Sequence, residues 1–156
     1  MLGVMPNLDA LVTTTLDNGL DVIVDSDLTL PAVAINLWYN VGSADERPGR
    51  DGFAHLFEHL MFSGTTSGIA SGEHLATIEA VGGSANATTS FDRTNYFELV
   101  PPGALELGLW LEAERMAHLA VTEESLTTQR DVVKVEKRPG YAKRPYAALR
   151  GDGLGR

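Results

Sequence analysis

The sequence contains no cysteine, which excludes disulfides and thiolate ligands, so any metal ion must be bound by histidine and carboxylate side chains. Basic residues are few: twelve Lys and Arg stand against twenty-one Asp and Glu, and the formal net charge is −9. This acidity argues against nucleic acid or an anionic membrane as a partner. No apolar run reaches the roughly 20 residues of a membrane span, and the N-terminus lacks the basic region and apolar run of a signal peptide. We therefore expect a cytoplasmic protein, or a periplasmic or secreted one if a leader has been removed.

The composition is that of a globular protein, with 44% apolar and 21% charged residues in 156 positions. This length suffices for a real core, so we expect residues 1–156 to form a single domain. Strands are expected over residues 12–16, 20–25, 32–41, 84–90 and 94–100, and helices over residues 52–62, 72–81, 103–120 and 122–138. Asn18-Gly19 predicts a hairpin between the first two strands, and Ser71 and Thr122 are the expected helix N-caps. The order of elements predicts an α+β fold, a mainly antiparallel sheet with helices packed on one face.

One segment carries a chemical pattern: GFAHLFEHLMFSGT, residues 52–65, places His55, Glu58 and His59 within one turn of a predicted helix. Residues four apart lie on one helix face, with Cβ atoms about 5–6 Å apart, so the two imidazoles can converge on one ion. Two neutral imidazoles and a third protein ligand, with a position left for water, form the catalytic zinc arrangement. A free carboxylate beside that water, here Glu58, is what a general base requires.

The rest of this segment is apolar, and three ionisable side chains in such surroundings are unfavourable unless a metal ion compensates their desolvation. The alternative is a buried helix whose histidines are satisfied by backbone groups or carboxylates. The spacing of the triplet, together with the downstream segments described next, favours the metal site.

The order His-x-x-Glu-His is the inverzincin pattern, and this segment resembles the zinc-binding segment of the pitrilysin/insulinase family of metallopeptidases, which includes the mitochondrial processing peptidases. The resemblance implies that His55 and His59 bind zinc and that Glu58 activates water. A later segment, QRDVVKVEKR, is similar to the stretch that holds the family's last zinc-binding Glu, which implies Glu136 as the third ligand. The family often has Glu at the position of Gln129, where it hydrogen-bonds a ligating histidine. Gln can still accept that bond but carries no charge, so we expect somewhat weaker zinc binding.

The segment GGSANATTSFDRTNYFELVP, residues 82–101, is similar to a second stretch of the family. The resemblance implies that Ala85, Asn86 and Ala87 lie on an edge strand that hydrogen-bonds the substrate backbone beside the scissile bond. Backbone pairing of this kind gives affinity without demanding a particular side chain. Standing alone, the segment would be interpreted as an ordinary hairpin strand.

Two further ionisable residues lie on predicted helices. Glu112 can pair with Arg115 or supply the third zinc ligand, and we favour the ion pair. His74 is interpreted as a surface or packing histidine rather than a ligand. The apolar stripe that carries Glu112 is expected to contain Leu105, Leu109, Met116 and Leu119.

The resemblance runs from about residue 13 to residue 146 and is weak over the tail, residues 139–156. Family members consist of two related halves that close around the substrate, so this chain resembles a partial N-terminal domain of a clamshell metallopeptidase. We expect a zinc-dependent endopeptidase that cleaves peptides or unfolded segments and needs a second half or partner subunit, in a homo- or heterodimer, for full activity. The alternatives are a non-catalytic peptide-binding scaffold, a fragment inactive on its own, and a zinc hydrolase of non-peptide substrates.

Overall fold

The computed structural model describes residues 11–143, with side chains through Glu136, so most of the weakly matching tail lies outside the described residues. The chain divides by its internal contacts into residues 1–31 and residues 32–156. In the first unit, strands β1 (Leu11–Thr15) and β2 (Asp21–Asp25) pair antiparallel. Gly19 takes the positive φ of 86° that the connecting turn requires, which confirms the predicted hairpin.

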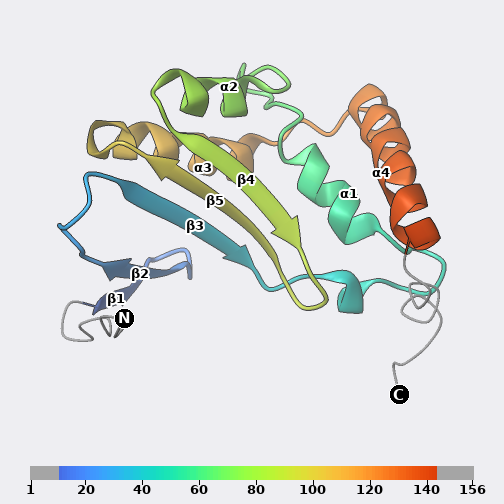
Figure 1. Cartoon of the computed structure of the whole chain (residues 1–156), viewed down its shortest axis with the longest axis horizontal. Helices are drawn as coiled ribbons and strands as arrows, with labels where there is room; N and C mark the ends of the chain where they lie inside the picture. The colour runs from blue at the N-terminus through green and yellow to red at the C-terminus, as the bar shows by residue number, and fades with distance from the viewer. Residues whose placement is uncertain (1–10, 144–156) are drawn as a thin grey trace. The chain divides into compact units, whose positions relative to one another are not determined.

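The second unit contains a three-stranded antiparallel sheet in the order β3-β5-β4 (Figure 1). Its strands, all predicted from the sequence, are β3 (Val33–Tyr39), β4 (Ser84–Thr89) and β5 (Thr94–Val100). A tight turn joins β4 to β5, in which the Ser90 amide donates to the Arg93 carbonyl over 2.8 Å. Within the described residues, β4 pairs only with β5, so its other side is a free edge.

Helices complete the second unit. They are α1 (Phe53–Leu60), α2 (Glu73–Ala80), α3 (Leu105–His118) and α4 (Glu123–Lys143), with short 3-10 helices η2 (Ser43–Asp45) and η3 (Pro102–Ala104). Residues of α2 and α3 pack with the sheet in a shared core of Ile35, Ile78, Val100, Ala104 and Leu111. Figure 1 shows α1 beside β4 and α4 alongside α1. The predicted α+β architecture is therefore confirmed.

The buried face of α3 differs from the predicted stripe. Leu109 and Met116 are about half exposed, whereas Gly108, Leu111, Glu112 and Arg115 are buried. The reason is the glycine: a Cβ at position 108 would lie 2.6 Å from the Ile35 side chain, so the helix approaches the sheet closely through this bare position. A prediction from hydrophobicity alone therefore selects the wrong face of α3 as the buried one.

Helix ends also depart from the predictions. The N-cap of α2 is Gly72, in the left-handed conformation, rather than Ser71. The last helix continues to Lys143 instead of ending near residue 138, while its Thr122 cap is confirmed by a 3.1 Å bond from the Ser125 amide to the Thr122 hydroxyl. None of the described helices combines the length and apolar character needed to cross a membrane.

Candidate metal centre

The start of α1 is fixed by a carboxylate from the preceding loop. Glu46 accepts hydrogen bonds from the backbone amides of Gly52, over 2.7 Å, and Ala54, over 2.8 Å. These are among the amides that a helix N-terminus leaves without an internal partner. The Gly52 cap itself has no side chain, so Glu46 supplies the acceptor that a capping residue ordinarily provides.

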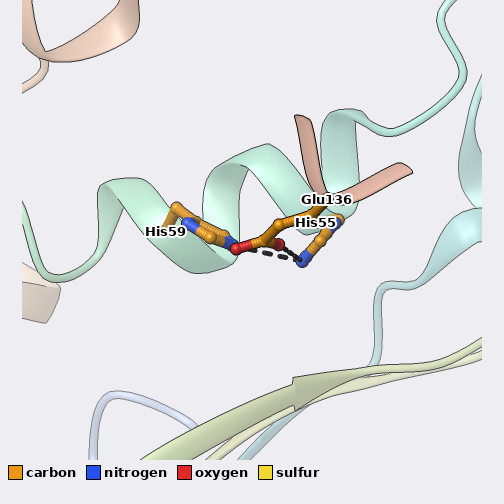
Figure 2. Close-up of side chains that lie close together, drawn as sticks. All are labelled: His55, His59 and Glu136. Atoms are coloured by element: carbon orange, nitrogen blue, oxygen red, sulfur yellow. Dashed lines mark hydrogen bonds and ion pairs between the residues drawn. The ribbon is translucent and has the colours of Figure 1, made fainter. Parts of the chain in front are cut away.

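Helix α1 is held against α4 by apolar contacts. Leu56 and Leu60 are buried against Val133 of α4. This contact places Glu136, less than one turn beyond Val133, next to the histidine-bearing face of α1 (Figure 2). The neighbouring Val132 is 38% exposed.

Three side chains converge between these helices. The Nε2 atoms of His55 and His59 are 3.1 Å apart, and each lies 3.5 Å from Oε2 of Glu136 (Figure 2). A tetrahedral zinc ion with bonds of about 2.0–2.1 Å separates its ligand atoms by about 3.3–3.4 Å. The triangle of donor atoms therefore has the dimensions of three zinc ligands, and two imidazoles with one carboxylate are a donor set that zinc accepts.

The three side chains are also accessible. His55 is 34% exposed, His59 20% and Glu136 49%, so a fourth position on an ion held here would be open to water or substrate. Catalytic zinc sites keep such an open position, whereas structural sites are closed by four protein ligands.

Glu58 does not join this triangle. Its Oε2 atom instead accepts a hydrogen bond from the hydroxyl of Thr89, the last residue of β4. Among residues 11–136, no hydrogen bond joins the Glu58 carboxylate to a histidine, and Glu58 is not part of the group of converging donor atoms although it lies on the same helix turn as the histidines. Sequence reasoning did not identify Thr89, and only its position at the end of the strand could have indicated it.

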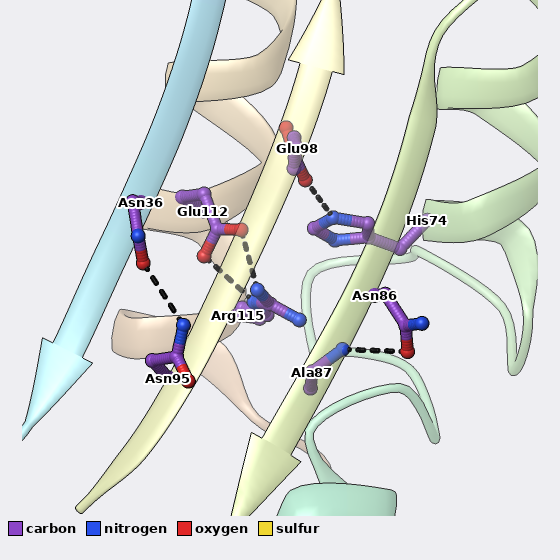
Figure 3. Close-up of polar contacts among 8 residues, drawn as sticks. All are labelled: Asn36, His74, Asn86, Ala87, Asn95, Glu98, Glu112 and Arg115. Atoms are coloured by element: carbon purple, nitrogen blue, oxygen red, sulfur yellow. Dashed lines mark hydrogen bonds and ion pairs between the residues drawn. The ribbon is translucent and has the colours of Figure 1, made fainter. Parts of the chain in front are cut away.

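The edge of β4 presents backbone groups at the predicted substrate segment. Along an antiparallel ladder, hydrogen-bonded residue pairs alternate with non-hydrogen-bonded ones. The pair of Ser90 and Arg93 is hydrogen-bonded, so the pairs that contain Ala85 and Ala87 are non-hydrogen-bonded. The backbone amide and carbonyl groups of Ala85 and Ala87 therefore point away from β5. The amide of Ala87 is already occupied, since it donates over 2.8 Å to the side-chain oxygen of Asn86 (Figure 3). A peptide strand adding at this edge would compete with Asn86 for that donor.

A second cluster of ionisable residues is buried beneath the sheet (Figure 3). Nε2 of His74 lies 2.5 Å from Oε1 of Glu98, and Arg115 donates to both oxygens of Glu112. The predicted pairing of Glu112 with Arg115 is thus confirmed. His74 is only 4% exposed, so of the two predicted locations, surface or packing, the structure has the packing one, and its partner Glu98 lies on β5.

This buried cluster is an ion-pair network rather than a metal site. Carboxylate and imidazole atoms only 2.5 Å apart are too close to be two ligands of one zinc ion. Both oxygens of Glu112 are engaged by the guanidinium, which also stacks 4.3 Å from the ring centre of Tyr96. Burial raises the pKa of the Glu112 carboxyl, and the nearby Arg115 charge offsets this only in part. Burial raises the pKa of the Tyr96 phenol as well.

Gln129 is partly buried on α4 and makes no hydrogen bond to either histidine in the described part of the chain. Its contribution to the histidines therefore stays a prediction. Glu46 is a residue that sequence reasoning missed, because a carboxylate six residues before the N-cap Gly52 has no local pattern that would single it out.

Comparison with known proteins finds related peptidases. The model of the insulinase family, peptidase family M16, matches residues 21–149. A zinc protease of Helicobacter pylori, PqqE, is 37% identical over 127 residues, which cover 81% of this chain and 28% of that protein. A probable beta subunit of the mitochondrial-processing peptidase of Arabidopsis thaliana is 32% identical over 120 residues, covering 77% of this chain and 22% of that protein.

The solved structures that superpose on this chain are also peptidases. A protease from Helicobacter pylori superposes with a TM-score of 0.79 at 36% identity, covering 82% of this chain and 31% of that one. Pitrilysin superposes with a TM-score of 0.74 at 26% identity, covering 84% of this chain and 14% of that one. This chain thus spans less than a third of each of these relatives. By its sequence match over residues 21–149, the chain belongs to the insulinase family of peptidases, family M16.

Proposed function

We propose that this chain carries the zinc-binding and proton-transferring residues of an endopeptidase that hydrolyses peptides or unfolded segments. The observation that supports this most directly is the triangle of donor atoms from His55, His59 and Glu136, with edges of 3.1, 3.5 and 3.5 Å. A zinc ion held there would lower the pKa of a water molecule toward about 7 and polarise the peptide carbonyl.

The remaining steps belong to this chain's own residues. Glu58 takes a proton from the attacking water and passes it to the leaving amine, so the carboxylate is regenerated after each cleavage. The substrate backbone pairs with the free edge of β4 at Ala85 and Ala87, which aligns an extended peptide without selecting one side chain. Asn86 must release the Ala87 amide when the substrate binds there.

Full activity requires more than this segment, in our proposal. The relatives are at least three times as long as the matched region, and the pitrilysin-like proteins suggest a second peptidase half or a partner subunit. No residue within 11–136 is assigned to stabilise the oxyanion that forms during cleavage. Losing one oxyanion donor typically lowers the rate by about 100–1000-fold, so the chain alone should be a slow peptidase.

The test is hydrolysis of an unstructured peptide by the zinc-loaded chain, alone and mixed with the remaining part of a longer relative. Glu58→Gln should abolish cleavage while the zinc content stays at the wild-type level. Glu79→Gln, which alters an exposed glutamate on α2, is the matched control and should cleave normally. Full activity of Glu58→Gln would refute the assignment of the base.

A further inference from the structure

The environment of Glu58 contains a contact that the zinc triangle does not explain. Its carboxylate is partly buried between α1 and β4, and the hydroxyl of Thr89 donates to its Oε2 atom. Among residues 11–136 no other hydrogen bond reaches this carboxylate. Thr89 therefore hydrogen-bonds one oxygen of the Glu58 carboxylate, Oε2, and the other oxygen, Oε1, has no hydrogen-bond donor among these residues.

The position of the Thr89 hydroxyl is itself well defined. Thr89 ends β4 and pairs directly with Thr94 of β5, one pair before the turn that joins these strands. Thr94 is 6% exposed and donates its own hydroxyl hydrogen to the Val41 carbonyl over 3.0 Å. Because threonine is β-branched, few χ1 rotamers are available to Thr89. The donor is thus held by the sheet rather than by the flexible end of a side chain.

We propose that Thr89 is a positioning residue that orients the Glu58 carboxylate. This inference rests on the proposed function of Glu58 and adds to it. With Oε2 held by the hydroxyl, Oε1 is the atom that receives the proton of the attacking water and later gives it to the leaving nitrogen. Strand β4, whose edge would bind the substrate, then also positions the Glu58 carboxylate through Thr89. The substrate and the base are therefore both positioned by the same strand.

The experiment compares Thr89→Val and Thr89→Ala, which lack the hydroxyl, with Thr89→Ser, which keeps it. Valine suits a strand as well as threonine does, so folding should be preserved, and Thr89→Ala covers the case in which it is not. A misplacement of about 1 Å can lower a rate by about 100-fold. We expect kcat to fall about 10–100-fold in Thr89→Val and Thr89→Ala, with KM and zinc content unchanged and with kcat restored in Thr89→Ser.

Thr88→Val is the matched control, because it removes a hydroxyl from the neighbouring position, which bonds to Asn95 rather than to Glu58. It should leave kcat unchanged. A wild-type kcat in both hydroxyl-free variants, or an equal loss in Thr88→Val, would overturn the proposal.

High-resolution crystal structures of the same variants supply a readout that does not depend on activity. The Glu58 carboxylate should keep its position in Thr89→Ser and shift or adopt several positions in Thr89→Val. An unmoved carboxylate in Thr89→Val would overturn the role of Thr89. Absence of hydrolysis by zinc-loaded wild type, even with the remaining part of a relative, would instead refute the proposed function.

Discussion

At the residue scale, the imidazoles of His55 and His59 lie on α1, one helix turn apart. Two histidines four positions apart must face the same way on a helix, so the close approach of His55 and His59 follows from local geometry. Glu136 is different, because it lies 77 residues beyond His59 and only the family resemblance pointed to it. Its approach to both histidines depends on how α1 packs against α4, which no local pattern specifies.

The buried pair of Glu112 and Arg115 leads to a prediction about stability. Arg115→Gln would leave the buried Glu112 carboxyl without the guanidinium that donates to both of its oxygens, and breaking a buried pair in this way lowers the free energy of unfolding by about 3–5 kcal/mol. Glu106→Gln, an exposed position on the same helix, should change it by less than about 1 kcal/mol. Chemical denaturation measures both values. Equal, small effects would show that the pair does not stabilise the fold.

The same pair predicts a pH dependence. Because burial raises the pKa of Glu112, the folded protein keeps this proton to higher pH than the unfolded chain does. The free energy of unfolding contributed by Glu112 should therefore fall as pH rises from the ordinary carboxyl value of 4.5 through the raised one. The difference between wild type and Glu112→Gln isolates this contribution, since other titrating groups are shared. A difference that grows with rising pH would contradict the assignment.

At the scale of elements, the strands and hairpins followed from β-prone runs and turn residues, and all five strands lie close to their predicted positions. Helix faces were harder to predict. The stripe on α3 was misplaced because Gly108, which has no side chain, makes the close approach to Ile35 of the sheet. A buried ion pair on that same face further lowers its apparent hydrophobicity.

The cap on α1 yields a prediction at this scale. Glu46→Ala removes the acceptor for the Gly52 and Ala54 amides, and loss of a helix cap lowers the free energy of unfolding by about 0.5–2 kcal/mol. Because α1 carries both histidines, zinc affinity should fall as well. Glu79→Ala is the control, since the Glu79 side chain makes no hydrogen bond in the described part of the chain. Zinc titration and denaturation of the two variants would test this, and identical behaviour would argue against the cap.

At the scale of the whole molecule, the family and the fold could be predicted from the sequence. The resemblance rested on three ordered segments, and the family match over residues 21–149 confirms it. The chain spans less than a third of the relatives described above, so it gives no information about residues in the rest of those longer proteins. The sequence does not predict substrate preference either.

The central claim is that His55, His59 and Glu136 bind one zinc ion. Its most direct test is the metal content of the purified chain, measured for wild type, Glu136→Gln and Glu112→Gln. The structure predicts close to one zinc per chain in wild type and in folded Glu112→Gln. It predicts a large loss in Glu136→Gln, because among the carboxylates of residues 11–136 only that of Glu136 lies within 3.5 Å of both histidine nitrogens. Wild type without zinc, or zinc lost from Glu112→Gln but kept by Glu136→Gln, would contradict this account.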